Sequence, residues 1–134
     1  MAIKTPTTPY AMNAATLTLG ADDWTAGVTQ AELQPQNGEV VTGIGGHKYR
    51  APSLWQLVLG HLQDADVAGL TRYLFDHEGE TVTFELAPVE DGITWSGEVV
   101  LSPTAIGGTG GTSLAQASAT LEVVGRPTPV DPAP

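Results

Sequence analysis

The sequence predicts a mostly-β domain flanked by a single helix. Apolar and polar residues alternate along most of the chain, and turn-forming residues, among them 16 glycines, separate the alternating stretches. Its 134 residues suit one domain, which can bury roughly two-thirds of its unfolded surface. With 41% hydrophobic and 15% charged residues, the composition supports a folded core rather than disorder.

The first strands are short. Clean alternation predicts one strand over residues 15–19, and a second follows over residues 27–33 after an acidic turn. Pro35 either ends the second strand or places it at a sheet edge, because proline cannot donate a hydrogen bond to a ladder.

Three segments depart from the alternation. Residues 1–12, with two prolines, are expected to form an N-terminal arm. Residues 36–52 show no periodic apolar face, and we expect a long, flexible or conditionally ordered loop there. Residues 127–134 contain four prolines and are expected to form a tail outside any ladder. The predicted domain therefore spans residues 1–126.

Residues 53–62 carry apolar side chains on both faces of an extended chain. One face would hold Trp55, Leu57 and Leu59, and the other Leu54, Val58 and Leu62. This arrangement is typical of a central strand covered on both sides. A helix is the alternative interpretation of the same run.

A helix is predicted over about residues 66–78. Asp64 or Asp66 can cap its first turn, and Gly79 can close it in a left-handed conformation. Helical spacing places one apolar stripe along it, composed of Val67, Leu70, Leu74 and Phe75. Three further strands are predicted over residues 80–87, 93–102 and 114–124, with a glycine-rich loop at residues 107–111 before the last.

No catalytic, cofactor or metal chemistry is expected. The chain has no cysteine, and no ligand-like spacing ties any two of the three histidines together: His47, His61 and His77. The loop at residues 107–111 lacks the lysine and the following helix of a phosphate-binding loop. No Gly-x-Ser-x-Gly motif marks a nucleophile. No apolar run approaches the roughly 20 residues of a membrane-spanning helix.

Charge gives the stronger functional signal. The net charge is −10, and five scattered cations cannot supply a nucleic-acid-binding groove. Glu85, Glu98 and Glu122 lie on the polar sides of three predicted strands, and they would form an acidic wall if those sides coincide. Alternatively, they simply face solvent. Lys48 and Arg50 place two cations in one irregular segment, which suggests contacts between copies, although a solvated pair is an equal alternative.

An ordered series of short motifs lies between residues 53 and 128. These are Gln63-Asp64, Gly69-Leu70, Tyr73-Leu74, Glu78-Gly79, Phe84, Pro88, Trp95-Ser96-Gly97, Leu101-Ser102-Pro103, Gly107-Gly108 and Val124-Gly125-Arg126-Pro127. Each motif is loose, but their order and spacing together resemble the tail tube proteins (major tail proteins) of long-tailed, siphovirus-type bacteriophages.

This resemblance implies a β-sandwich or barrel of the tail tube type, in a non-enzymatic virion protein assembled in the cytoplasm of a bacterial host. Its copies would form stacked hexameric rings, through which DNA passes during genome ejection without specific binding. Its partners would be itself and the tape measure, tail terminator and tail tip proteins, with no membrane. If the polar sides of their strands coincide, we expect Glu85, Glu98 and Glu122 to line that lumen.

Residues 36–52 match, in place and character, the loop by which such subunits contact the neighbouring ring. The residues expected to make that contact are Gly43, Ile44, Gly45, Gly46, His47, Lys48, Tyr49 and Arg50. Two alternative functions are the tube of a related bacterial secretion or contractile apparatus and a surface-exposed β-sandwich binding module. A binding module would favour a patch of exposed aromatics, whereas Trp24, Trp55 and Trp95 are spread through predicted strands.

Overall fold

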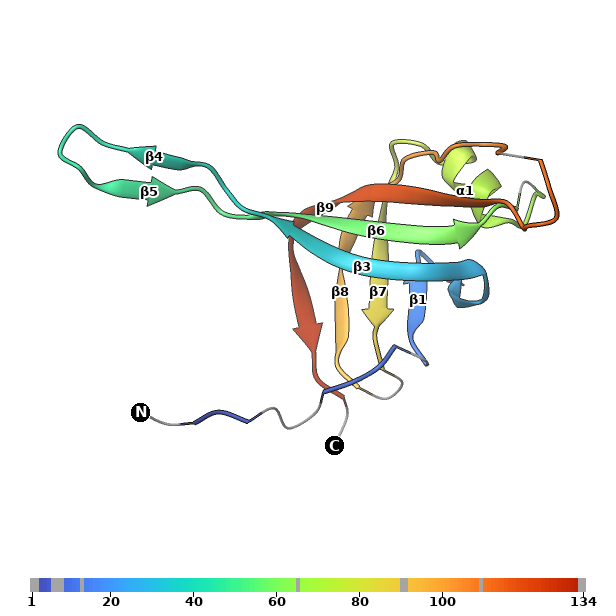
Figure 1. Ribbon diagram of the computed structural model, residues 1–134, viewed down its shortest axis with the longest axis horizontal. Coiled ribbons are helices and arrows are strands. Elements are labelled where there is room, and N and C mark those ends of the chain that lie inside the picture. Colours follow the sequence, from blue (N-terminus) through green and yellow to red (C-terminus); the bar gives the residue numbers. More distant parts are fainter. Residues whose placement is uncertain are drawn as a thin grey trace.

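The computed structural model describes residues 3–5, 9–12, 14–64, 66–89, 92–108 and 110–132. They form one seven-stranded antiparallel sheet, in the order β2-β1-β7-β8-β9-β6-β3, and a separate two-stranded hairpin (Figure 1). The strands of the large sheet are β1 (Thr16–Leu19), β2 (Asp22–Asp23), β3 (Val28–Gln36), β6 (Leu54–Leu62), β7 (Thr81–Ala87), β8 (Thr94–Val100) and β9 (Gln116–Val130). A 3-10 turn, η1 (Thr25–Gly27), and one α-helix, α1 (Leu70–Asp76), complete the body. The mostly-β class with one helix is confirmed.

The large sheet is continuous and bends over itself at β9. The first half of this 15-residue strand pairs with β6, and its second half pairs with β8. The two pairings meet at Glu122, and Gly125, at a φ of +77°, and a register shift beside Gly97 follow within the half that pairs with β8. In Figure 1, β3 and β6 consequently cross β7 and β8 at a steep angle. The described chain thus forms one bent sheet rather than a sandwich of two separate sheets, and its edge strands are β2 and β3.

The concave side of the bent sheet holds the core. Leu17 and Leu19 of β1, Phe84 and Leu86 of β7, and Leu57 and Leu59 of β6 are all buried there, together with Val99, Leu101, Ala119, Leu121 and Val123. Leu70 and Leu74 of α1 pack onto the same cluster. Each such leucine contributes about 1.5–3 kcal/mol of transfer free energy, so the helix and the two arms of the sheet stabilise one another.

Strand β6 confirms the strand interpretation of residues 53–62, but its two faces differ. Leu57 and Leu59 are completely buried, whereas Leu54 is 70% exposed. The prediction that both faces are covered was therefore wrong at this end of the strand. Pro35 lies opposite Trp55 in β3, which is an edge strand, and so the edge interpretation of this proline is confirmed.

Helix α1 is shorter than the predicted residues 66–78. It begins at Leu70 and ends at Asp76, and two members of the expected stripe are exposed: Val67 by 79% and Phe75 by 57%. Gly79 has a φ of +82° beyond the C-cap His77, as expected of a residue that closes a helix.

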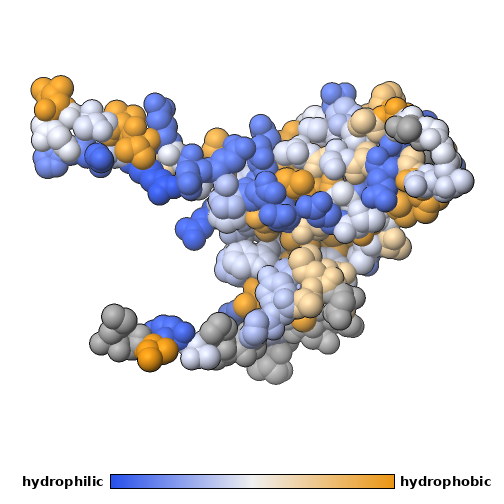
Figure 2. All heavy atoms as spheres, in the orientation of Figure 1, coloured by the Kyte–Doolittle hydropathy of each residue, from blue (hydrophilic) through white to orange (hydrophobic). Residues whose placement is uncertain are grey.

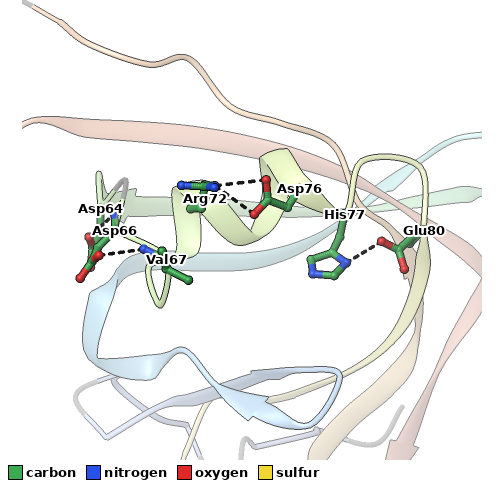
Figure 3. Close-up of polar contacts among 7 residues, drawn as sticks. All are labelled: Asp64, Asp66, Val67, Arg72, Asp76, His77 and Glu80. Carbon is green, nitrogen blue, oxygen red and sulfur yellow. Dashed lines mark hydrogen bonds and ion pairs between the residues drawn. The ribbon is translucent and has the colours of Figure 1, made fainter.

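The two predicted capping carboxylates serve a turn that precedes the helix. Asp64 Oδ1 accepts a hydrogen bond from the Asp66 backbone at 3.1 Å, and Asp66 Oδ1 accepts one from Val67 at 2.8 Å (Figure 3). The N-cap itself is Gly69, without a side-chain cap. A Cβ on Gly69 would overlap the backbone oxygen of Asp64, so close packing of the turn delays the helix.

The predicted proline-rich tail at residues 127–134 is partly wrong. Strand β9 continues to Val130, and Thr128 and Pro129 lie opposite Ser96 and Trp95 of β8. Strand β6 pairs with β9 only as far as Glu122, which leaves one edge of the later residues free. Proline nitrogens can face that free edge without costing a ladder hydrogen bond. Residues 133–134 of the tail lie outside the described residues.

Candidate functional site

Residues 40–50 form a β-hairpin where the sequence predicted an irregular loop. Strands β4 (Val40–Thr42) and β5 (Lys48–Arg50) pair in an antiparallel register. The turn is held by a hydrogen bond of 2.7 Å from the Gly43 nitrogen to the His47 oxygen, and Gly46 adopts a φ of +86°. In Figure 1 the hairpin projects far from the body. Strands of three residues are too short to show periodicity, which explains the error.

The hairpin stands apart from the large sheet and exposes apolar side chains. In the described chain it pairs with no strand of the seven-stranded sheet. Its large apolar side chains are exposed, by 54% to 113% of their reference areas: Val40, Val41, Ile44 and Tyr49. A lone two-stranded hairpin is marginally stable in water, and clustered exposed apolar groups mark interaction sites.

Cations accompany these apolar groups. Lys48 and Arg50 are exposed, and neither forms an ion pair with a carboxylate in the described part of the chain. Figure 2 shows hydrophobic and hydrophilic side chains side by side along the hairpin. All eight residues expected to make a contact between rings, from Gly43 to Arg50, therefore belong to one protruding, amphipathic and cationic element.

The neck of the hairpin fixes its direction. The Ala51 nitrogen donates to the Glu39 oxygen at 2.9 Å, which joins the outgoing and returning chains. One residue earlier, a Cβ on Gly38 would overlap the carbonyl oxygen of Ala51. Only glycine permits so close an approach of the two backbones. This contact and the hydrogen bond between Ala51 and Glu39 therefore constrain the direction in which the hairpin leaves the body.

The three predicted glutamates share one face of the sheet. Glu85 lies opposite Ser96 of β8, and Glu98 follows two residues later on the same side of that strand. Val100, two residues further, lies opposite Glu122 of β9. Opposed residues in an antiparallel ladder project to the same side, and so do residues two apart along a strand. All three side chains are exposed on the convex face, away from the core.

The rest of this convex face is mainly polar, although the register also places Val58, Val100 and Val124 on it. Its paired positions in the described strands carry no positive charge. The pairing of the strands places two further acids, Glu32 and Asp23, on the convex face. Between the acids stand hydroxyl and amide side chains, chiefly Thr16, Thr18, Thr81, Thr83, Ser96, Ser118, Thr120, Gln34 and Gln56. Of the five cations, Arg126 lies nearest in sequence to these paired positions, in the irregular stretch of β9.

The histidines do not converge on one site. His47 lies in the turn of the hairpin, His61 is fully buried on the concave face, and His77 contacts Glu80 at 2.5 Å beyond α1 (Figure 3). Among the described residues, no group of three or more potential ligands is placed to hold a metal ion. Within those residues, too, no helix is long and apolar enough to cross a membrane.

No protein-family model matches this sequence, and no curated protein matches it. Two surfaces of the described molecule have a distinctive chemistry, the cationic hairpin and the acidic convex face.

The sequence predicts the residues of the hairpin and, conditionally, those of the acidic face, but it gives no sign of a third surface, a groove at the start of α1. The groove is lined by four segments of the chain: residues 23–27, 62–64, 68–70 and 114–115. No motif joins these segments, and only the folded chain brings them together. The hairpin, the acidic convex face and the groove are thus three separate solvent-facing features of the molecule.

Proposed function

We propose that this chain is the structural subunit of a bacteriophage tail tube. Its copies assemble into stacked, hexameric rings whose channel conducts DNA during genome ejection. The observation that carries the proposal is the convex face, on which glutamates from three adjacent strands stand among hydroxyl groups with no opposing cation at the paired positions. As the wall of a channel, such a face repels phosphates and gives DNA nothing to hold.

The sheet edges support assembly into a closed ring. Strand β3 has nine residues and pairs on one side only, and the short β2 forms the opposite edge. Unpaired edges of this kind join readily to strands of another chain, and closure into a barrel removes them. Edge pairing between neighbouring copies would extend the acidic face around a lumen.

The hairpin supports stacking of one ring on the next. Its apolar side chains and unpaired cations project from a body of strongly negative net charge, so a second copy is the natural partner. A head-to-tail contact of this kind propagates until another protein stops it. The tape measure, terminator and tip proteins of the tail are the proposed additional partners, and the virion is the proposed location.

Electron microscopy of the purified protein at high concentration tests assembly directly. We expect rings or hollow tubes, and a protein that stays monomeric under every nucleating condition would contradict the proposal.

The orientation of the face has a separate test, because the chain contains no cysteine. In Thr83→Cys the thiol lies on the convex face, opposite Glu98. A maleimide attached to a globular protein too wide for the lumen should label the monomer and spare the assembled tube. The control Glu78→Cys, in the exposed turn after α1, should be labelled in both states. Equal labelling of Thr83→Cys in tubes would place the face outside.

A tube of a bacterial secretion or contractile apparatus would share these surfaces and differ in its cargo. Isolation of tubes with and without DNA-filled phage heads attached discriminates the two.

A further inference from the structure

The groove at the start of α1 is a solvent-accessible hollow of about 500 Å³. Its apolar wall is formed by Trp24, Leu62, Leu70 and Leu114, and two acidic residues, Asp23 and Asp64, also line it. Leu114 is 74% exposed and belongs to no strand or helix. Among the described residues that line the groove there is no lysine or arginine.

The groove and the hairpin lie at opposite ends of the same two strands. The hairpin continues β3 beyond Gln36 and returns into β6 at Leu54. The groove starts at the other ends of these strands, with Gly27 directly before β3 and Leu62 as the last residue of β6. A nine-residue strand spans about 30 Å. In Figure 1 the hairpin and α1, at which the groove lies, are at opposite ends of the molecule, so one copy cannot place its own hairpin in its own groove.

The two ends have complementary chemistry. The hairpin offers apolar Val41, Ile44 and Tyr49 beside the cations Lys48 and Arg50. The groove offers apolar walls beside Asp23 and Asp64, whose side chains are in exposed positions. Complementary charges steer association and select against wrong partners, while burial of the apolar groups supplies the affinity.

We propose that the groove at the start of α1 receives the hairpin of a second copy. This inference rests on the proposed function and names the receptor for its stacking contact. Because donor and receptor surfaces lie at opposite ends of each subunit, every bound copy presents a fresh groove or hairpin to the next. The polymer grows along the direction of β3 and β6.

Two complementary variants test the proposal. Ile44→Asp disables the hairpin, and Leu114→Lys disables the groove by removing an apolar side chain and repelling the incoming cations. Each variant alone should stop at monomers or single rings in sedimentation and electron microscopy. An equimolar mixture retains one intact hairpin–groove pair and should form two-layered assemblies but no long tubes. Tubes from Leu114→Lys alone, or no co-assembly in the mixture, would overturn the proposal.

Control variants separate loss of contact from loss of fold. Val130→Lys makes a similar change at the opposite end of β9 from the groove, and we expect it to polymerise as wild type does. Thermal unfolding of the Leu114→Lys monomer should match that of wild type, because the side chain is mostly exposed. If wild type itself forms neither rings nor tubes, the proposed function fails too. If only the groove variant behaves unexpectedly, the tube assignment stands and the receptor is wrong.

Crosslinking gives an independent result. With no native cysteine, the double variant Ile44→Cys, Leu114→Cys carries one thiol at each proposed contact. A short bifunctional maleimide should join its copies into a ladder of multimers. Ile44→Cys, Val130→Cys should give no such ladder, and equal ladders from both would overturn the assignment of the groove.

Discussion

The carbonyl oxygen of Ala51 lies against Gly38, in the space that a Cβ at position 38 would occupy. This approach of two backbones forms the neck between the seven-stranded sheet and the hairpin. The neck lies outside the large sheet, so its geometry can be changed without touching the core. Direction of the hairpin and stability of the body are therefore separable properties.

Replacement of Gly38 by alanine should redirect the hairpin and abolish tube formation. The added methyl group forces the neck apart, whereas the buried leucines of the sheet are unaffected. We expect a thermal midpoint for the monomer within a few degrees of wild type, which corresponds to less than about 0.5 kcal/mol. The control is Gly108→Ala in the loop before β9, outside the hairpin, where an added Cβ would meet no heavy atom within 4 Å. Loss of assembly in both variants would contradict the role of the neck.

Charge reversal on the convex face should make the channel retain DNA. Glu98→Lys and Glu122→Lys together place two cations on adjoining strands of that face in every copy. Each phosphate neutralised adds roughly 0.9 to the slope of log affinity against log salt, so retention should weaken steeply with ionic strength. The measurement is co-sedimentation of tubes with short duplex DNA over a salt series. Glu78→Lys, beyond the helix, should bind less, and equal binding by the two would argue against a lumenal face.

Truncation of a side chain should cost much more stability on the concave side of β9 than on its convex side. Leu121 is completely buried and Val124, three residues later, is 53% exposed. Leu121→Ala should lower the free energy of unfolding by about 2–5 kcal/mol, because it removes core contacts and leaves a cavity. Val124→Ala should change it by about 0.5 kcal/mol or less. Urea denaturation of the two monomers measures both, and similar losses would show that the assignment of faces is wrong.

The sequence predicted the strands well where alternation was long. The alternating Val82, Phe84 and Leu86 predict a strand with one buried face without further information. The structure places all three toward the core. The coincidence of Glu85, Glu98 and Glu122 on one face was only a conditional prediction. It depends on the register between strands, and register follows from pairing over the whole sheet rather than from any local pattern.

The errors have local causes of different kinds. Val67 has helical spacing to Leu70, but the contact between Gly69 and Asp64 imposes a turn first. The prolines after Arg126 predict the end of the ladder, yet the second half of β9 has a free edge that tolerates them. The groove gave no signal at all, because its walls come from segments as far apart as Trp24 and Leu114.

The carboxyl group of Asp23 should titrate below its ordinary value of 3.8. Hydrogen bonds from the Thr25 hydroxyl and the Thr25 backbone nitrogen stabilise its charged form and lower its pKa. This stabilisation is complete above pH 3.8 and is lost as the pH falls through the lower pKa of the folded state. Thr25→Val removes the hydroxyl donor and should move the titration midpoint of Asp23, followed by NMR, upward. The control Thr29→Val should leave the titration midpoint of Asp23 unchanged. An unchanged midpoint in Thr25→Val would contradict the role of the Thr25 hydroxyl in lowering the pKa.

The place of β9 in the sheet has a consequence for how the chain is made. Every other strand precedes β9 in the sequence, yet β9 lies between β6 and β8 and joins the two arms of the bend. A ribosome therefore releases the hairpin while the sheet is still in two unconnected pieces, and Leu114 of the groove emerges only just before β9. In the assembly proposed above, a growing chain would expose its hairpin long before its own groove is complete. Late synthesis of the central strand would then keep each chain from accepting a second copy until its own synthesis ends.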